Sequence, residues 1–210
     1  MGKAAMTIAF RRKAAATLWA AAISLPLVFG VWQFGQGFYI MAKAELAQAL
    51  LGRAWARTLI DGGTHKAWPW ADAWPVAELE FPSLGESQIV LSNASGEALA
   101  FGPGHLPGTP LPDARGTMVI AAHRDTHFSI LRELESDDPV ILTTSDGFKR
   151  KYKITMTKVV DAESSGIDPR SGAGLALVTC YPFDSRERGR LRYVLFASPV
   201  AVASASQQFR

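Results

Sequence analysis

From about residue 75 onward, short apolar runs alternate with clusters of glycine, proline, serine, aspartate and asparagine, and this spacing restricts the fold more than any other feature. Runs of this length suit β-strands, and turn residues at such short intervals are typical of a β-barrel or β-sandwich. The expected strands cover residues 76–81, 88–91, 117–122, 140–143, 149–160, 175–180 and 191–197. The proline-rich stretch 101–116 is expected to be a loop, and residues 128–135 a short helix. The sequence therefore predicts one mainly β domain.

The N-terminal part of the chain has a different character, because a long apolar run, 14–31, follows a cluster of four cations. About 20 apolar residues are enough to span the hydrocarbon core of a membrane. A cleaved signal peptide is the alternative, but its apolar core is shorter and ends at a small-x-small site, whereas here aromatic residues continue to Tyr39. A retained transmembrane anchor over residues 14–41 is therefore favoured, followed by a juxtamembrane helix within 42–63.

The charge distribution bears on orientation and on possible partners. The four N-terminal cations exceed the formal net charge of +3, so the remaining residues are slightly acidic overall and predict no nucleic-acid-binding face. The same cluster contains no acids, which favours a cytoplasmic location for residues 1–13 and places residues 43–210 outside the cytoplasm.

Cys180 is the only cysteine of the chain and cannot form an intrachain disulfide. Free cysteine is among the residue types most often buried, so Cys180 can be a small core residue. It can equally be a reactive thiol, because it stands at the end of an apolar run. Composition alone leaves both interpretations open.

Two further residues of reactive type occupy comparable places. His123 ends the apolar run of "GTMVIAAHRDTHF", and Arg192 opens the strand that follows Cys180. A hairpin between 175–180 and 191–197 would bring Arg192 beside the thiol. Acyl transfer at an amide needs a thiolate, a proton donor for the departing amine, and positive charge near the oxyanion. Spacing alone does not distinguish Arg192 from its neighbour Arg190 and two other nearby arginines.

Several motifs together resemble one enzyme family. "LALVTC" resembles the T-L-x-T-C signature of sortases, the membrane-anchored cysteine transpeptidases, and "RYVLFA" resembles the strand that carries their arginine. "WPWADAWPVAEL", "ALAFGPGH", "AAHRDTHF" and "VTCYPF" resemble the Gram-negative group called class GN. The similarity covers residues 66–200 and departs from the signature at Ala176, where threonine is usual.

The resemblance implies a role for each matched residue. Cys180 would be the nucleophile, His123 the general acid and then base, and Arg192 the cation that positions substrate and stabilises the oxyanion. Thr179 would donate a supporting hydrogen bond, and Asp125 would orient the loop. The implied fold is a closed eight-stranded sortase-type β-barrel with short helices over residues 64–210, after the N-terminal transmembrane helix.

No cofactor or metal is expected. The pair His123 and His127 lacks a third matched ligand, and a solvated turn accounts for the acidic group at 133–138.

The resemblance also implies partners and a location. The enzyme would act on a dedicated exported substrate protein with a C-terminal sorting signal and pass it to an amine acceptor. It would be a single-pass protein of the inner membrane, with its catalytic domain in the periplasm. Another cysteine acyl-transfer enzyme acting mainly as a hydrolase, and a non-catalytic membrane-tethered β domain, are the alternatives.

Overall fold

The computed structural model describes residues 2–112, 115–170, 172–185, 187 and 189–200, and in parts of the first helix only the backbone. A long helix, α1 (Gly2–Asp61), precedes all of the strands. The strands are β1 (Pro75–Phe81), β2 (Glu86–Leu91), β3 (Gly104–His105), β4 (Gly116–Ala121), β5 (Pro139–Thr144), β6 (Lys149–Asp161), β7 (Ala173–Cys180) and β8 (Leu191–Pro199). In the described connections lie the short 3₁₀ helices η1 (Ala98–Ala100) and η2 (Ser129–Glu133).

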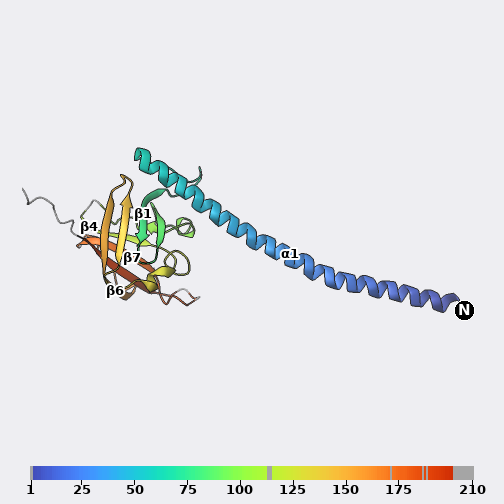
Figure 1. The fold of residues 1–210 in the computed structure, drawn as a ribbon. Coiled ribbons are helices and arrows are strands. Elements are labelled where there is room, and N and C mark those ends of the chain that lie inside the picture. The colour runs from blue at the N-terminus through green and yellow to red at the C-terminus, as the bar shows by residue number, and fades with distance from the viewer. Residues whose placement is uncertain (1, 113–114, 171, 186, 188, 201–210) are drawn as a thin grey trace, which may run out of the picture. The chain divides into compact units, whose positions relative to one another are not determined.

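These strands close into a barrel with the order β1-β2-β3-β4-β7-β8-β6-β5 (Figure 1). Most neighbours are antiparallel, but β2 pairs with β3, and β4 with β7, in parallel. Parallel neighbours need a long crossover connection, and the crossover from β4 to β7 contains β5 and β6. The crossover brings the ends of β4 and β7 to the same edge of the barrel, although they lie far apart in the sequence.

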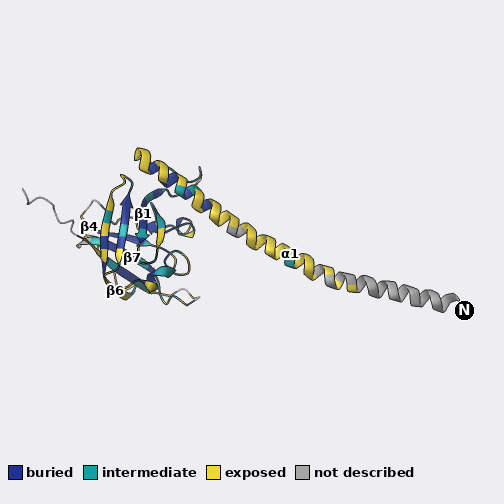
Figure 2. Cartoon of the chain, in the orientation of Figure 1, coloured by how far each residue is buried: buried dark blue, intermediate teal, exposed yellow. Residues whose placement is uncertain are grey.

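The core fills the inside of the barrel because alternate side chains of each strand point inward. In β1 the alternation is strict, and Leu79 and Phe81 are fully buried. The same cluster includes inward-facing residues of β4, β7 and β8, namely Met118, Ile120, Leu175, Leu177 and Leu195; buried residues are dark blue in Figure 2. Removing one such large side chain typically costs about 2–5 kcal/mol of unfolding free energy. The predicted mainly β closed barrel is therefore confirmed.

The end of α1 belongs to the same compact unit as the barrel, which spans residues 47–210. Leu51 packs in a cluster with Ala73 and Leu91, and the Trp55 indole N–H donates to Glu78 at 3.4 Å. The helix ends where Gly62 adopts a positive φ of 68° and its N–H bonds the carbonyl of Thr58, a glycine C-cap. The helix therefore ends at Asp61, within the range 42–63 given for the expected juxtamembrane helix.

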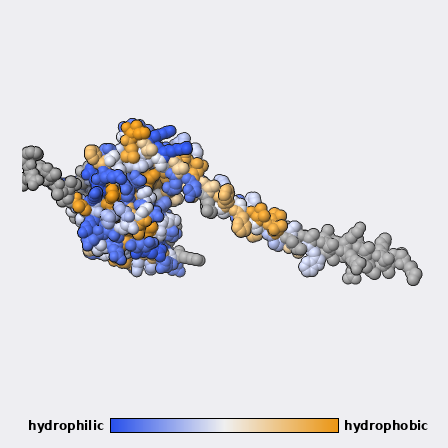
Figure 3. Space-filling model, viewed as in Figure 1, coloured by the Kyte–Doolittle hydropathy of each residue, from blue (hydrophilic) through white to orange (hydrophobic). Residues whose placement is uncertain are grey.

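The first 46 residues form a separate unit. Its helix is continuous with the following residues, so the expected anchor and juxtamembrane helix are parts of a single element, α1. Large apolar side chains along its middle are exposed, and hydrophobic residues gather there in Figure 3. Among the described residues, no helix combines enough length and apolarity to cross a membrane.

The strand predictions were accurate except in one place. Each of the seven expected strands is present, with bounds that differ by one or two residues. The proline-rich stretch was wrongly expected to be loop throughout, because β3 lies within it and pairs with both β2 and β4. Gly104 permits this pairing, since a Cβ there would collide with the carbonyl oxygen of Asn93.

Candidate active site

The register of β4 and β7 brings His123 and Cys180 to neighbouring positions. Ala121 pairs with Val178, the last pair of this parallel ladder. The Ala122 N–H donates to the Val178 carbonyl at 3.2 Å, which extends the pairing by one residue. With the same offset, His123 lies opposite Cys180. The two residues are then on adjacent chain segments, which in a sheet lie about 4.8 Å apart.

Thr179 ties these two chain segments together. Its Oγ1 donates to the Ala122 carbonyl at 2.7 Å, and the side chain is only 2% exposed. The bond joins the residue before the thiol to the residue before the imidazole. The supporting hydrogen bond expected of Thr179 is thus present, and its acceptor is a backbone carbonyl.

Arg192 lies beside Cys180 in the β7–β8 hairpin, as the sequence predicted. The two residues are register partners in this antiparallel pair. Arg192 Nη1 donates to the carbonyls of Gly189 and Leu191 at 2.8 and 2.9 Å. A guanidinium has five N–H donors, so Nε and Nη2 remain available to a substrate.

Arg190, the competing cation, is engaged elsewhere. Its guanidinium forms ion pairs with Asp161 at 3.4 Å and with Glu163 at 2.8 Å. These contacts connect the start of β8 with the end of β6 and the residues after it. The structure therefore separates the two arginines, which spacing alone could not do.

The three candidate side chains share the outer face of the barrel. In β4, Met118 and Ile120 belong to the core, as does Ala122 directly after the strand, so the alternate positions point outward; His123 continues this alternation and is exposed. Leu175 and Leu177 give β7 the same alternation, which places Cys180 outside. Register partners of neighbouring strands share a face, so Arg192 follows Cys180.

An apolar groove of about 460 Å³ occupies this outer face. Its floor is formed by outward side chains of β4, β7 and β8, and Ile167 of the β6–β7 connection packs against them. The lining residues are Leu106, Thr109, Val119, Ala121, Lys158, Val160, Ala162, Ser165, Gly166, Ile167, Val178, Arg192, Val194 and Phe196. A groove of this volume and apolar lining can hold an extended peptide with apolar side chains.

The loop after His123 is fastened to the loop after Cys180. Arg124 Nη2 donates to the Glu187 carbonyl at 2.7 Å, and Arg132 forms an ion pair with Asp184 at 3.1 Å. The Arg132 guanidinium also lies 5.2 Å from the centre of the Phe183 ring. Sequence reasoning missed Arg124, because no local pattern marks a contact between residues 63 positions apart.

Asp125 and His127 occupy different environments in this loop. Asp125 is exposed, and no described residue forms a hydrogen bond with its carboxylate, so the predicted orienting role finds no support. Burial, followed by the nearby charge of His123, lowers the pKa of His127 below its ordinary value. Gln88 Nε2 donates to the His127 carbonyl at 2.6 Å, which holds this residue against β2.

Two residues of the acidic group at 133–138, and also His105, have structural partners. Asp138 accepts from Ser83 and from the Glu135 N–H, and Asp137 forms an ion pair with Lys153. His105 bonds the backbone carbonyl of Thr109 at 3.0 Å. In the part of the chain that the structure describes, no three potential ligands form a metal-binding group.

The chain is similar to known proteins over this barrel. The family model described as "Sortase domain" matches residues 79–200. Sortase D of Bacillus subtilis (strain 168) is 32% identical over 124 residues, which are 58% of this chain and 62% of that protein. The chain thus spans less than two thirds of the length of this relative.

Solved structures share the fold. "Sortase A from Corynebacterium diphtheriae" has a TM-score of 0.55 and 24% identity, with 67% of each chain covered. A Clostridium perfringens Sortase D5 transpeptidase has a TM-score of 0.58 and 17% identity, covering 75% of this chain and 99% of the other. At these identities the similarity concerns the fold.

Proposed function

The chain belongs to the sortase family, and on that premise we propose that it is a cysteine transpeptidase. It cleaves the C-terminal sorting signal of an exported protein and transfers the new carboxyl end to an amine. The motifs around His123 and Cys180 support placement in class GN, in which one enzyme serves one dedicated substrate.

The observation that carries this proposal is the shared placement of three side chains. Cys180 pairs with Arg192 across the hairpin, and the β4–β7 offset carries His123 opposite Cys180. All three lie on the outer face, at one end of the groove whose lining includes Arg192. Neither a core cysteine nor a purely structural arginine requires this arrangement.

The first half of the reaction forms a thioester. The Cys180 thiolate adds to the carbonyl carbon of the scissile peptide bond, and the free donors of Arg192 stabilise the oxyanion that develops. When the C–N bond breaks, the His123 imidazolium gives its proton to the departing amine. The acyl part of the substrate remains bound through Cys180 Sγ.

The second half releases the product. The acceptor amine attacks the thioester carbonyl, and the neutral His123 imidazole takes a proton from the amine nitrogen. The C–S bond then breaks, which restores the thiolate and the imidazolium. Throughout this half-reaction the acyl peptide must stay in place, a role for which the apolar groove is suited.

A peptide library tests the reaction and needs no defined sorting motif. Peptides with five randomised central residues are incubated with the enzyme and hydroxylamine, and products are identified by mass spectrometry. The proposal expects C-terminal hydroxamates of one preferred core, and an acyl adduct on Cys180 in the intact protein. Cys180→Ala must abolish both products, whereas His65→Gln, at a half-buried position beside Asp61, serves as the control.

We further propose that α1 anchors the enzyme in the inner membrane, with the barrel in the periplasm. Two observations support this: the N-terminal cations and the large apolar side chains exposed on the helix. These side chains are Trp19, Leu27, Val28, Phe29, Val31, Trp32, Phe34, Phe38 and Tyr39. Exposed apolar surface of this extent is stabilised by lipid or by another protein.

Topology is tested with alkaline phosphatase, a reporter active only outside the cytoplasm, fused to the C-terminus. We expect phosphatase activity and a full-length protein in the membrane fraction. Release of a shortened soluble form would instead indicate a cleaved signal peptide.

A further inference from the structure

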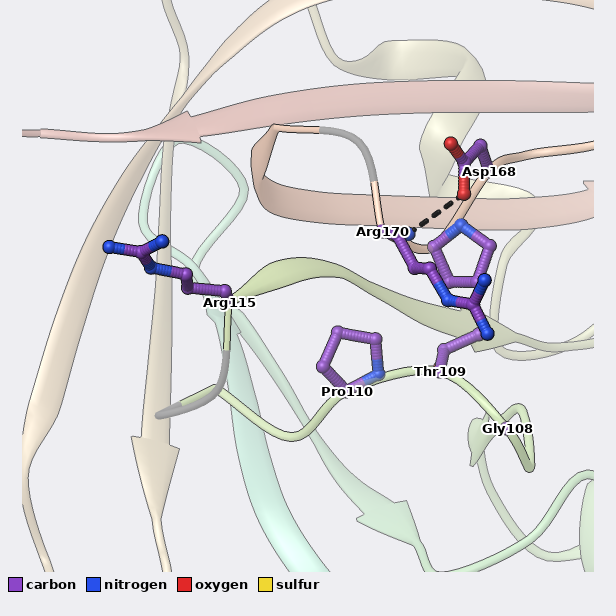
Figure 4. A pocket seen from close by; sticks show the side chains of 7 residues that line it. Gly108, Thr109, Pro110, Arg115, Asp168 and Arg170 are labelled. Carbon is purple, nitrogen blue, oxygen red and sulfur yellow. Dashed lines mark hydrogen bonds between the residues drawn. The ribbon is translucent and has the colours of Figure 1, made fainter.

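A second hollow, of about 660 Å³, opens where the β3–β4 and β6–β7 connections meet. It is lined by Gly108, Thr109, Pro110, Arg115, Asp168, Pro169 and Arg170. Figure 4 shows Arg115 and Arg170 on opposite sides of Pro110, with the Asp168 carboxylate turned toward the backbone nitrogen of Arg170. None of these residues belongs to the catalytic group.

The two connections are held together, so the hollow is preformed. The Thr117 N–H donates to the Pro169 carbonyl at 2.9 Å. Gly116 has a φ of 121°, and a Cβ at this position would collide with the same carbonyl. On the other wall, Thr109 Oγ1 accepts from the Val119 N–H at 3.2 Å. A preformed site loses less conformational entropy when a ligand binds.

The hollow is cationic. Arg115 and Arg170 are both exposed, and no described residue forms an ion pair with either guanidinium. Among the described residues of the lining Asp168 is the one acid, and its Oδ1 accepts from the Arg170 N–H at 3.0 Å. The lining of the adjoining apolar groove contains two cations, Lys158 and Arg192, and no acid among its described residues. The combined surface therefore favours an anionic ligand.

The hollow continues the groove away from the thiol. Both are lined by Thr109, and Ile167 of the groove directly precedes Asp168 of the hollow. Arg115 directly precedes β4 and His123 lies two residues after it, so eight positions along the chain separate them. At roughly 3.3 Å per residue this is about 26 Å, the length of about eight residues of extended peptide.

We propose that this hollow binds acidic residues of the substrate about six to eight positions before the scissile bond. The inference rests on the proposed transpeptidase function, in which the groove holds the acyl side of the substrate. A peptide that continues beyond the groove on that side reaches Arg115 and Arg170. Because the two guanidiniums flank the hollow, each meets a separate carboxylate.

The test uses the preferred core from the library, extended by eight N-terminal residues. One extension contains only glycine and serine, a second has aspartate at positions six and eight before the scissile bond, and a third has lysine there. We expect kcat/KM for the aspartate peptide to exceed that of the neutral peptide about threefold to tenfold at low salt, mainly through KM. The lysine peptide should fall below the neutral one, and 0.5 M NaCl should remove the differences.

Substitutions in the hollow must remove the preference for the aspartate peptide and leave the turnover of the neutral peptide unchanged. R115Q and R170Q together should equalise the three peptides, with the neutral peptide turned over at the wild-type rate. R57Q, which removes an exposed cation from α1, is the matched control and should keep the preference. Equal kcat/KM for the three peptides with the wild-type enzyme would overturn the proposal, as would a preference that survives the double variant.

The peptide experiments distinguish a wrong assignment of the hollow from a wrong assignment of the transpeptidase function. Without the transpeptidase function, no library peptide is processed, whereas a wrong inference leaves a processed core that ignores its extension. Binding is measured independently by titrating N-acetyl-Asp-Gly-Asp-amide into the full chain in detergent and following the arginine Nε–H NMR signals. Shifts of Arg115 and Arg170 are expected, and their absence at millimolar peptide contradicts the site. Equal shifts with inorganic phosphate identify a general anion site and reject peptide recognition.

Discussion

Thr179→Val tests whether one buried hydrogen bond sets the catalytic geometry. Valine has nearly the shape of threonine, so the substitution removes the Oγ1–H donor and leaves the packing almost unchanged. The lost bond joins Thr179 to the Ala122 carbonyl at 2.7 Å, and each of these residues is followed directly by a catalytic candidate. The variant therefore separates the bond from the shape of the side chain.

The expected loss of unfolding free energy in Thr179→Val follows from the burial of this side chain. Thr179 is 2% exposed, so water cannot replace the lost donor, and an unsatisfied buried carbonyl costs about 1–3 kcal/mol. For a domain of this size, that loss of unfolding free energy corresponds to a fall in melting temperature of roughly 2–12 °C. A displacement of about 1 Å between catalytic groups can cost about 100-fold in rate. We expect kcat/KM to fall about 10- to 100-fold.

The assay combines thermal unfolding, followed by circular dichroism, with turnover of the library-selected peptide at 25 °C, where the variant is folded. Thr179→Ser is the control because it keeps the hydroxyl and loses only a methyl group, and its kcat/KM should stay within about threefold of wild type. A valine variant with lower stability and unchanged kcat/KM would falsify the positioning role. It would show that the bond supports the barrel alone.

Three further predictions concern individual side chains. Cys180→Ala should abolish turnover and change the melting temperature by only a few degrees; residual transfer would contradict the nucleophile assignment. Arg192→Lys should lower kcat about 100- to 1,000-fold because lysine lacks the planar fork, whereas Arg190→Lys should change it less than about threefold, and the reverse order would reject the choice of Arg192. Burial lowers the pKa of His105 below its ordinary value of 6.5, so the unfolded state takes up a proton more readily and stability should fall as the pH drops below about 6.5. In urea unfolding, the free energy of unfolding of His105→Gln should fall less between pH 7.5 and pH 5.5 than that of wild type. Equal falls would exclude His105 as a source of the pH dependence.

The strands were predictable because their signals are local. Short apolar runs between clusters of turn residues predicted the bounds of β1, β4 and β7 to within two residues. β3 escaped because it has only two residues and its stability comes from pairing with two distant strands. No local propensity marks Gly104 as a strand residue, and glycine is unfavourable there on average. The hydrogen bonds of β3 to β2 and β4, and not its local sequence, make it a strand.

The candidate site was predictable in unequal parts. The proximity of Cys180 and Arg192 followed from a hairpin, which needs only the twelve-residue spacing between them. The proximity of His123 and Cys180 depends on the β4–β7 crossover, which local patterns do not reveal. The groove wall at Ile167 and the contact of Arg124 with Glu187 come from loops, whose path the sequence does not encode as a periodic pattern.

The position of the thiol is a consequence of core packing. In β7 the inward side chains Leu175 and Leu177 are buried in the barrel, and the two-residue period of a strand then requires Cys180 to face outward. A single residue inserted between Leu177 and Cys180 would turn the thiol toward the core or force the leucines out of it. Because β8 holds Leu195 inside by the same rule, Arg192 has to stay on the face of its partner Cys180. The residues that stabilise the barrel therefore also fix the side on which catalysis can occur.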